Sequence, residues 1–217
     1  MIPLRDDIRS GRFPLITISL IIVNVFIYIY QLSLGSSQEY FIWKYAVVAK
    51  TLTSFHPIHP SSTLLPPLTL ITSQFLHAGF LHLAGNMLFL WIFGDNVEAK
   101  LGYVRYLIFY IACGVISGLV QVLTFPHADM PLIGASGAIA GVMGAYFIRF
   151  PRAHVYTLII IWIVRLPAVI FLGLWFIYQL LNGAPTYGSA EGGVAYFAHI
   201  GGFIAGMVLF KLRKKYN

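Results

Sequence analysis

The sequence predicts an all-α, polytopic membrane protein, and composition and run length are the observations behind this. The chain is 59% hydrophobic and only 10% charged, with a mean hydropathy of +0.81, unlike a soluble domain. Several apolar runs reach about 17–20 residues, enough to cross ~30 Å of hydrocarbon as a helix. The single cysteine, Cys113, lies inside one of these runs, so an internal disulfide is excluded.

Six transmembrane helices are predicted, packed as one compact domain over residues 1–217. The predicted spans are residues 14–34, 80–97, 103–124, 134–150, 166–183 and 194–211. The first span follows a basic start, as a secretory signal would. Its apolar core is too long for a signal and no small-residue cleavage site follows, so we interpret it as a retained span.

The start of the fifth span depends on one arginine. The apolar run 155–164 is interrupted by Arg165 and Pro167 before a second run begins. Because an arginine in the middle of a bilayer costs at least ~2.5–3.5 kcal/mol, we place Arg165 at the interface. Residues 152–164 are then expected to lie on the membrane surface or dip into it.

The distribution of charge predicts the orientation. All lysines and arginines except Lys44 and Lys50 fall in the N-terminal tail, the turn 98–105, the connection 149–165 and the C-terminal tail. In a six-span arrangement these four segments share one side, which is therefore predicted to be cytoplasmic, with both termini. The net charge of +7 is thus a topology signal. A nucleic-acid surface is not predicted, because no continuous basic patch with stacking aromatics is present.

Polar residues occur at one depth on three of the spans. Spans two, four and six all enter from the outer side, and their first turns carry His82 and Asn86, Ser136, and His199. At ~1.5 Å per residue these groups lie roughly 3–10 Å below the outer surface. Because polar side chains within a bilayer usually face a cavity and mark function, the four are candidates for one site.

The residue types in this group suggest nucleophilic catalysis. A serine hydroxyl is a weak nucleophile and needs an adjacent base, for which His199 is the candidate by depth. His82 and Asn86 are spaced i, i+4, so both project from one helix face toward a common point. The backbone N–H of Ser136, at a helix start, adds a third donor. No acidic residue lies at this depth, so a Ser–His dyad is expected.

Each of these residues also has a plainer interpretation when taken alone. The stretch GASGAIAGVMG (134–144) is typical of a small-residue packing face, and the glycines of AHIGGFIAG (198–206) allow close helix approach. His82 alone is compatible with an interfacial histidine, Asn86 with an interhelical hydrogen bond, and His199 with an ion path. Their combination at one depth favours catalysis.

Three motifs resemble those of a known family. HLAGN (82–86), GASGA (134–138) and AHIGG (198–202) are similar, in order and spacing, to the motifs of the rhomboid intramembrane serine proteases. The stretch GDNVEAKLGYVRYLIFY (94–110) resembles the rhomboid segment that joins spans two and three. The resemblance covers residues 66–211.

This resemblance implies a function and residue roles. It makes Ser136 the nucleophile, His199 the general base, and His82 and Asn86 the oxyanion donors. It also implies that the substrates are transmembrane proteins, cut in or near their membrane segments. Some rhomboid proteases have a tyrosine four residues after the serine that stacks on the catalytic histidine. Here Ala140 stands at that position, so another group must orient His199.

Other functions are less compatible with the sequence. No H-E-x-x-H motif and no pair of membrane-embedded aspartates is present, so a zinc or aspartyl protease is not predicted, and no cofactor or metal is expected. A catalytically silent rhomboid-like protein that binds membrane clients is the main alternative. The intact serine, histidines and asparagine count against it. A transporter is less compatible, because the polar groups gather toward one side. The expected location is a bacterial inner membrane.

Two further residues and one loop are expected to have supporting roles. Glu98 is expected to pair with Lys100 or Arg105 at the cytoplasmic interface, and His77 to order the loop before span two. The small-residue loop 184–193 is expected to act as a lid on the outer side.

Overall fold

The computed structural model describes residues 1–186 and 194–213, and most of these residues are helical. Each predicted span is a helix with ends close to the expected ones. These helices are α1 (Leu15–Ser33), α5 (Phe80–Leu101), α6 (Tyr103–Thr124), α7 (Ser136–Arg149), α8 (Ala168–Gly183) and α9 (Tyr196–Arg213). Most of the predicted lid, 187–193, lies outside the described residues.

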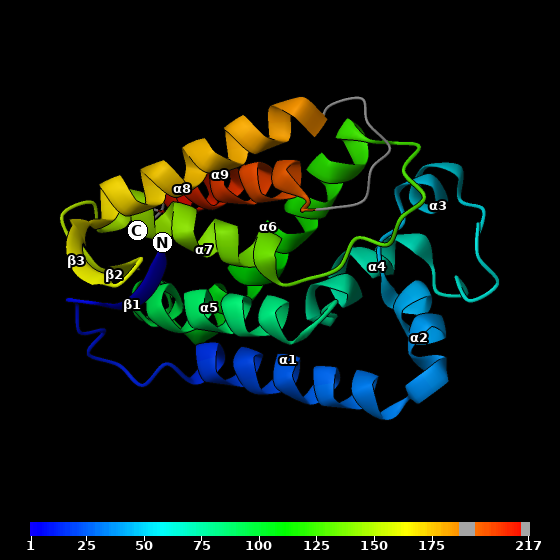
Figure 1. Ribbon diagram of the computed structural model, residues 1–217, viewed down its shortest axis with the longest axis horizontal. Helices are drawn as coiled ribbons and strands as arrows, with labels where there is room; N and C mark the ends of the chain where they lie inside the picture. Colours follow the sequence, from blue (N-terminus) through cyan, green and yellow to red (C-terminus); the bar gives the residue numbers. More distant parts are fainter. Residues whose placement is uncertain (187–193, 214–217) are drawn as a thin grey trace.

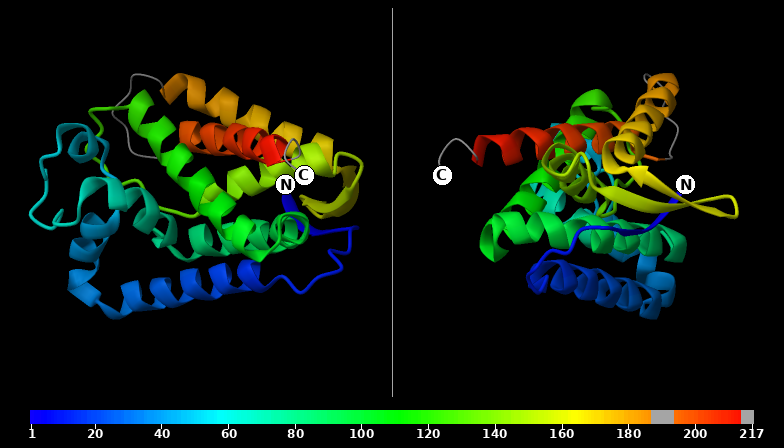
Figure 2. Two further views of the ribbon diagram at one scale, coloured as in Figure 1. Left: turned by 180° about the vertical axis from the view of Figure 1, so that it is seen from behind. Right: turned by 90° about the vertical axis from the view of Figure 1, so that its left-hand side faces the viewer.

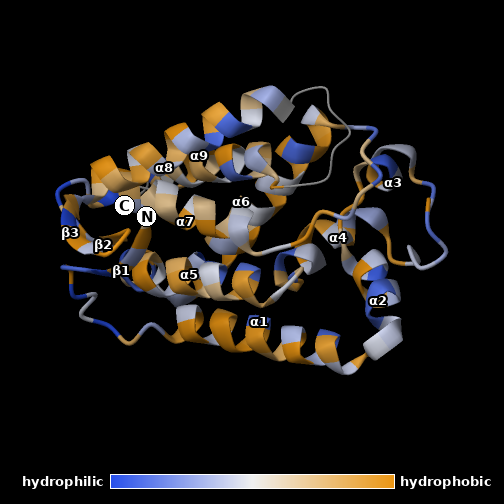
Figure 3. Cartoon of the chain, viewed as in Figure 1, coloured by the Kyte–Doolittle hydropathy of each residue, from blue (hydrophilic) through white to orange (hydrophobic). Residues whose placement is uncertain are grey.

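Short helices fill the long connection between α1 and α5, and one more follows α8. They are η1 (Gly35–Ser37), α2 (Gln38–Tyr45), α3 (Ala49–Ser54), α4 (Pro66–Thr72), η2 (Ser73–Phe75) and η3 (Ala184–Thr186). Figure 1 shows α2 and α3 at the end of the molecule opposite both chain termini. In Figure 3 the long helices are largely apolar, whereas polar residues gather on α2 and α3.

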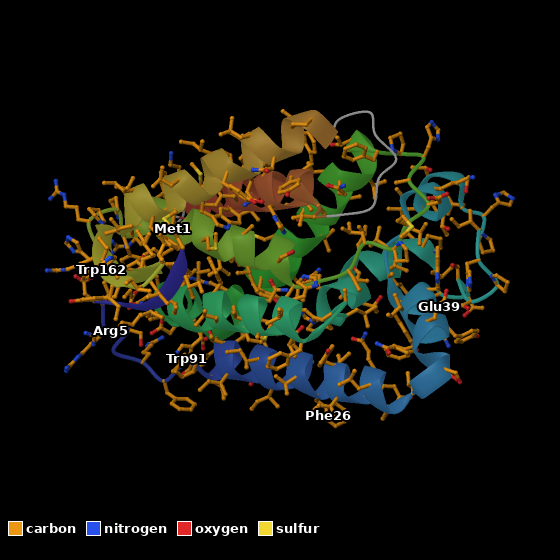
Figure 4. All side chains as sticks on the ribbon, in the orientation of Figure 1. Met1, Arg5, Phe26, Glu39, Trp91 and Trp162 are labelled. Carbon is orange, nitrogen blue, oxygen red and sulfur yellow. The ribbon has the colours of Figure 1, made fainter. Side chains whose placement is uncertain are left out.

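The helices differ in how well they fit a membrane. Within the described part of the chain, α1 and α6 are each long and apolar enough to cross a bilayer. The segment Pro66–Phe75 and α5, bent by 83°, qualify together as a broken span. Phe26 of α1 and Trp91 of α5 are 70% and 56% exposed, and Figure 4 shows Phe26 pointing away from the bundle. These faces suit contact with lipid.

Helix α7 occupies the centre of the bundle and packs against α9, α6 and α5 (Figure 1). Its 14 residues span only about 21 Å, which is less than the hydrocarbon thickness of a bilayer. A helix this short cannot reach both membrane surfaces, so its first residue lies inside the bundle. A Cβ on Gly202 of α9 would overlap the carbonyl of Gly137, and one on Gly206 would overlap the carbonyl of Gly141. The expected close approach of these two helices is therefore confirmed.

Glu98 has a different partner from the one predicted. Its carboxylate is 2% exposed and accepts hydrogen bonds from the N–H groups of Ile16 and Thr17 at 2.9 and 2.8 Å, and from Thr17 Oγ1 at 2.7 Å. These are free donors of the first turn of α1, where a negative charge is favoured by the helix dipole. The expected pairing of Glu98 with Lys100 or Arg105 is wrong, because the carboxylate caps a neighbouring helix instead.

A small β-sheet is the main feature that the all-α prediction missed. Strands β1 (Ile2–Asp6), β2 (His154–Ile159) and β3 (Trp162–Pro167) form an antiparallel sheet in the order β1-β2-β3. The run 152–164, expected along the membrane surface, thus folds back on itself as a hairpin. Its residues are largely β-branched or aromatic, and burial alternates along β2, as in a half-buried strand.

Two aspartates tie this sheet to the helices and to itself. Asp6 accepts a hydrogen bond from the hydroxyl of Tyr146 near the end of α7. Asp7 accepts from the backbone N–H of His154 at 2.8 Å and from Arg165 at 2.9 Å. The hydrogen bond from the His154 N–H, with a further one from Arg165, lowers the pKa of Asp7 below its ordinary value. These hydrogen bonds hold the N-terminal strand β1 against the end of α7 and against the β2–β3 hairpin.

Candidate active site

A cavity of about 600 Å³ lies among α5, α6, α7, α8 and α9 and the loop 131–135. Its lining includes Ser136, His199, His82 and Asn86. The four residues selected from the sequence therefore line one cavity, although three different helices carry them.

Ser136 is placed by a sharp turn before α7. Gly134 has φ +125°, a conformation that favours glycine, and its N–H donates to the carbonyl of Ser73 at 2.9 Å. A Cβ at Gly134 would lie 2.8 Å from Cε1 of His82, so a larger residue would also collide with that ring. Two residues later Ser136 begins α7, and its backbone N–H has no partner within the helix.

His199 reaches Ser136 from the first turns of α9. Its Nε2 lies 2.8 Å from Ser136 Oγ, within hydrogen-bonding distance. Two side chains of α6 form hydrogen bonds with the backbone of Ala198, the residue before His199. Gln121 Oε1 accepts from the N–H of Ala198 at 3.0 Å, and Ser117 Oγ donates to the Ala198 carbonyl at 2.8 Å. The approach of the imidazole to the serine is thus supported from a third helix.

Gln179 of α8 also contacts His199, and sequence reasoning did not select it. Its Oε1 lies 2.8 Å from Nδ1 of the imidazole, and the residue is 4% exposed. The ring of Trp175, one turn earlier, lies with its centroid 5.9 Å from the histidine ring. A signal was present, because Gln179 is a polar residue within the apolar run of the fifth span, and such residues usually have a function.

His82 and Asn86 approach the cavity from α5. Asn86 is 8% exposed, and its Nδ2 has no hydrogen-bond partner in the part of the chain that the structure describes. The ring of His82 packs edge-on against His77 at 5.1 Å between centroids. His77 is fully buried, and Gln31 of α1 holds its backbone with two hydrogen bonds of 3.2 Å. The loop before α5 is therefore held at the backbone of His77, and a role of the imidazole in ordering it stays a prediction.

The chemistry available in this cavity is that of acyl transfer. It combines a hydroxyl in contact with an imidazole and, across the cavity, a buried amide donor that lacks a partner. No carboxylate belongs to the cavity lining described here, so the second imidazole nitrogen meets a neutral amide. This arrangement suits a nucleophile with a general base, facing donors for a developing oxyanion.

Comparisons with known proteins identify the family of this chain. A model described as "Rhomboid domain" matches residues 66–215. RHOMBOID-like protein 5 from Arabidopsis thaliana is 33% identical over 141 residues, covering 64% of this chain and 42% of that protein. Rhomboid protein 1, mitochondrial, from Saccharomyces cerevisiae is 31% identical over 148 residues, covering 65% and 40%.

A bacterial relative is similar over a shorter stretch. Rhomboid protease GluP from Bacillus subtilis is 42% identical over 76 residues, which covers 35% of this chain and 14% of that protein. The matches cover about two-fifths of the length of the plant and yeast relatives. Because the rhomboid family model matches most of this chain, the chain belongs to the rhomboid family of multi-pass, helical membrane proteins.

Proposed function

We propose that this protein is an intramembrane serine endopeptidase that cuts other membrane proteins in or near their transmembrane segments. The observation that carries the proposal is the 2.8 Å contact between Ser136 Oγ and His199 Nε2 inside the cavity. A hydroxyl packed against an imidazole at this distance is the arrangement that activates a serine. The name of the Bacillus subtilis relative, a rhomboid protease, agrees with this reaction.

The proposed mechanism assigns one role to each residue. His199 Nε2 takes the hydroxyl proton as Ser136 Oγ bonds to the carbonyl carbon, and the carbonyl π electrons move to oxygen. Asn86 Nδ2, the His82 ring and the Ser136 backbone N–H donate to that oxyanion. When the C–N bond breaks, the leaving amine takes the proton from His199. Water then repeats the sequence on the acyl-enzyme, which releases the carboxylate and restores the serine.

The proposed topology has six spans, α1, α5, α6, α7, α8 and α9, in one domain. The basic segments lie on the cytoplasmic side with both termini, and the catalytic cavity opens toward the outer side. A location in a bacterial inner membrane stays a prediction. The names of the relatives include a mitochondrial one, so the family occurs in more than one membrane.

The alternative is a silent family member that binds membrane clients without cutting them. A binder needs the cavity but has no use for a hydroxyl in hydrogen-bonding contact with an imidazole. The unpartnered, buried amide of Asn86 also points to an anionic species that forms only during reaction. These two observations favour the protease.

Ser136→Ala tests the proposal directly. The purified protein in liposomes is incubated with a generic transmembrane substrate, and a fluorophosphonate probe is applied in parallel. We expect the wild type to cut the substrate and to take up the probe, and Ser136→Ala to do neither. Ser33→Ala, which removes a hydroxyl bonded to the Tyr30 carbonyl on α1, outside the cavity lining, controls for loss of an unrelated serine. Cleavage of the substrate by both the wild type and Ser136→Ala, or by neither of them, would rule out the proposed protease.

A further inference from the structure

We propose that Gln179 is a positioning residue that holds His199 in the tautomer needed to accept the proton of Ser136. The inference rests on the proposed function, because it concerns the same base. It also answers the question left by Ala140, namely what orients the histidine when no aromatic side chain stands four residues after the serine.

The orientation of the Gln179 amide is set by its own helix. Its Nε2 donates to the carbonyl of Trp175, four residues earlier, at 3.4 Å. This directs Oε1 toward the imidazole, where it lies 2.8 Å from Nδ1. An amide oxygen can only accept, so Nδ1 must carry the proton. In a neutral imidazole Nε2 then has the free lone pair, and Nε2 is the nitrogen that faces Ser136 Oγ.

The surroundings suit a neutral orienting group. Gln179 is 4% exposed, so a carboxylate at this position would have to be buried without a cation to balance it, which is costly in a membrane. An amide supplies the same acceptor without a charge. The carbonyl oxygen also becomes more effective when His199 is protonated, because hydrogen bonds to charged donors are the stronger ones. Gln179 therefore performs the orienting task that an acid performs in a catalytic triad.

Gln179→Met tests this inference. Methionine fills a similar volume but offers no comparable acceptor. Loss of a group that orients a functional histidine typically costs about 10–100-fold in activity in metal sites, and we expect a fall of this size in kcat with KM unchanged. Gln179→Glu offers an acceptor but buries a carboxyl group at this site, so it should recover only part of the lost kcat. Asn182→Leu is the matched control, since Asn182 lies on the same helix and donates to the carbonyl of Tyr178.

A second readout does not depend on cleavage. Nitrogen-15 NMR of the His199 ring should show a protonated Nδ1 in the wild type and a mixture of tautomers in Gln179→Met. A wild-type kcat in Gln179→Met, or an unchanged ring signal, would overturn the role of Gln179 and leave the Ser136 result intact. If the wild type itself fails to cut, the ring signal alone decides whether Gln179 sets the tautomer.

We also infer that the tip of the β2–β3 hairpin inserts into the bilayer surface on the side of the chain termini. The tip residues are apolar and exposed: Ile160 89%, Ile161 75%, Trp162 72% and Ile163 63%. The right-hand view of Figure 2 shows the hairpin projecting sideways past the helices. It therefore extends over the area that surrounds the bundle, which in a membrane protein is lipid.

The turn itself is unusual for a hairpin that faces water. Ile159 pairs with Trp162, so Ile160 and Ile161 form the two-residue loop, and Ile160 has φ +57°. Glycine or asparagine normally occupies such a position, because a left-handed conformation costs an L-residue roughly 1–2 kcal/mol. An isoleucine there is disfavoured both by backbone strain and by exposure to water. Insertion into lipid offsets the second cost and explains an apolar tip.

The position and charge of the hairpin select lipid as its partner. Strand β3 ends at Pro167, directly before the apolar helix α8 begins at Ala168, so the hairpin lies level with the end of a predicted span. Its base carries Arg152 and also Arg165, which pairs with Asp7, and Arg5 of β1 stacks over the ring of Tyr156 at 4.5 Å. Apolar tips with a basic base are typical of segments that bind anionic membrane surfaces.

An environment-sensitive fluorophore at Ile161 tests this inference. In a Cys113→Ala background, which removes the single native thiol, Ile161→Cys is labelled and the protein is reconstituted in phosphatidylcholine–phosphatidylglycerol vesicles. Arg152→Cys, exposed at the base of the same hairpin, is the matched control. We expect lipids with a nitroxide high on the acyl chain to quench the Ile161 label several-fold more than the Arg152 label.

Each outcome of this experiment is decisive. Stronger quenching at Ile161 that persists when the protein is diluted with lipid supports insertion. Equal quenching at the two positions would show a tip in water and overturn the inference. An apolar environment at Ile161 that disappears on dilution would mean that a second copy covers the tip, and this too would overturn it.

Discussion

His199→Ala is expected to lower kcat by about four to six orders of magnitude, the largest effect of any single change in the cavity apart from loss of the serine itself. Without an acceptor 2.8 Å from its hydroxyl, Ser136 cannot lose its proton as it attacks. Nucleophile and base act as one unit, so their losses are not additive. The double variant Ser136→Ala/His199→Ala should therefore be no slower than either single variant.

Single-turnover cleavage of a transmembrane substrate, with wild type and variants in the same liposomes, measures this effect. His127→Ala is the matched control, because His127 is an exposed histidine outside the cavity and its loss should leave kcat unchanged. The oxyanion donors remain in His199→Ala, so a small residual rate above water is expected. A rate within tenfold of the wild type would remove His199 from the mechanism.

The helices could be predicted well because membrane constraints are strong. In hydrocarbon every backbone N–H and C=O must be paired within its own segment, so long apolar runs become helices whatever their neighbours. The site could be predicted for a related reason. Polar groups in such runs are rare, and Ser136, His199, His82 and Asn86 lie at one depth, so residue numbers alone were enough to group them.

The features that were missed depend on contacts rather than on periodicity. The hairpin 154–167 needs the N-terminal strand as its neighbour, and residues 2–6 show no signal of their own for that pairing. Glu98 was assigned to Lys100 or Arg105 because they are near in sequence. Its carboxylate turns inward instead, to the first turn of α1, about eighty residues away along the chain.

Gln179 was missed for a different reason. Gln179 is visibly polar within an apolar run. It lies, however, in the last turns of a span predicted to run from the cytoplasmic to the outer side, whereas the predicted site residues lie in the first turns of their spans. Only the antiparallel packing of α8 against α9 brings the last turns of one helix to the first turns of the other. Counting depth back from the outer end of the descending span 166–183 as well would have included Gln179.

Asn86→Ala is expected to reduce kcat by about 10²–10³-fold, or ~2.7–4 kcal/mol, with little change in KM, as for loss of a single oxyanion donor. The reason is the buried Nδ2 group, which has no partner among the described residues. An unsatisfied buried donor typically costs the folded protein ~1–3 kcal/mol. The amide can find an acceptor during the reaction, when negative charge develops on the substrate carbonyl.

Stability separates this role from helix packing, because the two roles predict opposite changes. If Asn86 joined helices by a hydrogen bond, its loss would lower the free energy of unfolding by about 0.6 kcal/mol and spare turnover per folded molecule. As an oxyanion donor, Asn86→Ala should melt at the wild-type temperature or above it while kcat falls. Asn24→Ala is the matched control, since Asn24 is also buried but its Nδ2 donates to the carbonyl of Leu20. That variant should lose stability and keep kcat. Normal turnover by a folded Asn86→Ala protein would leave the oxyanion to His82 and the Ser136 amide alone.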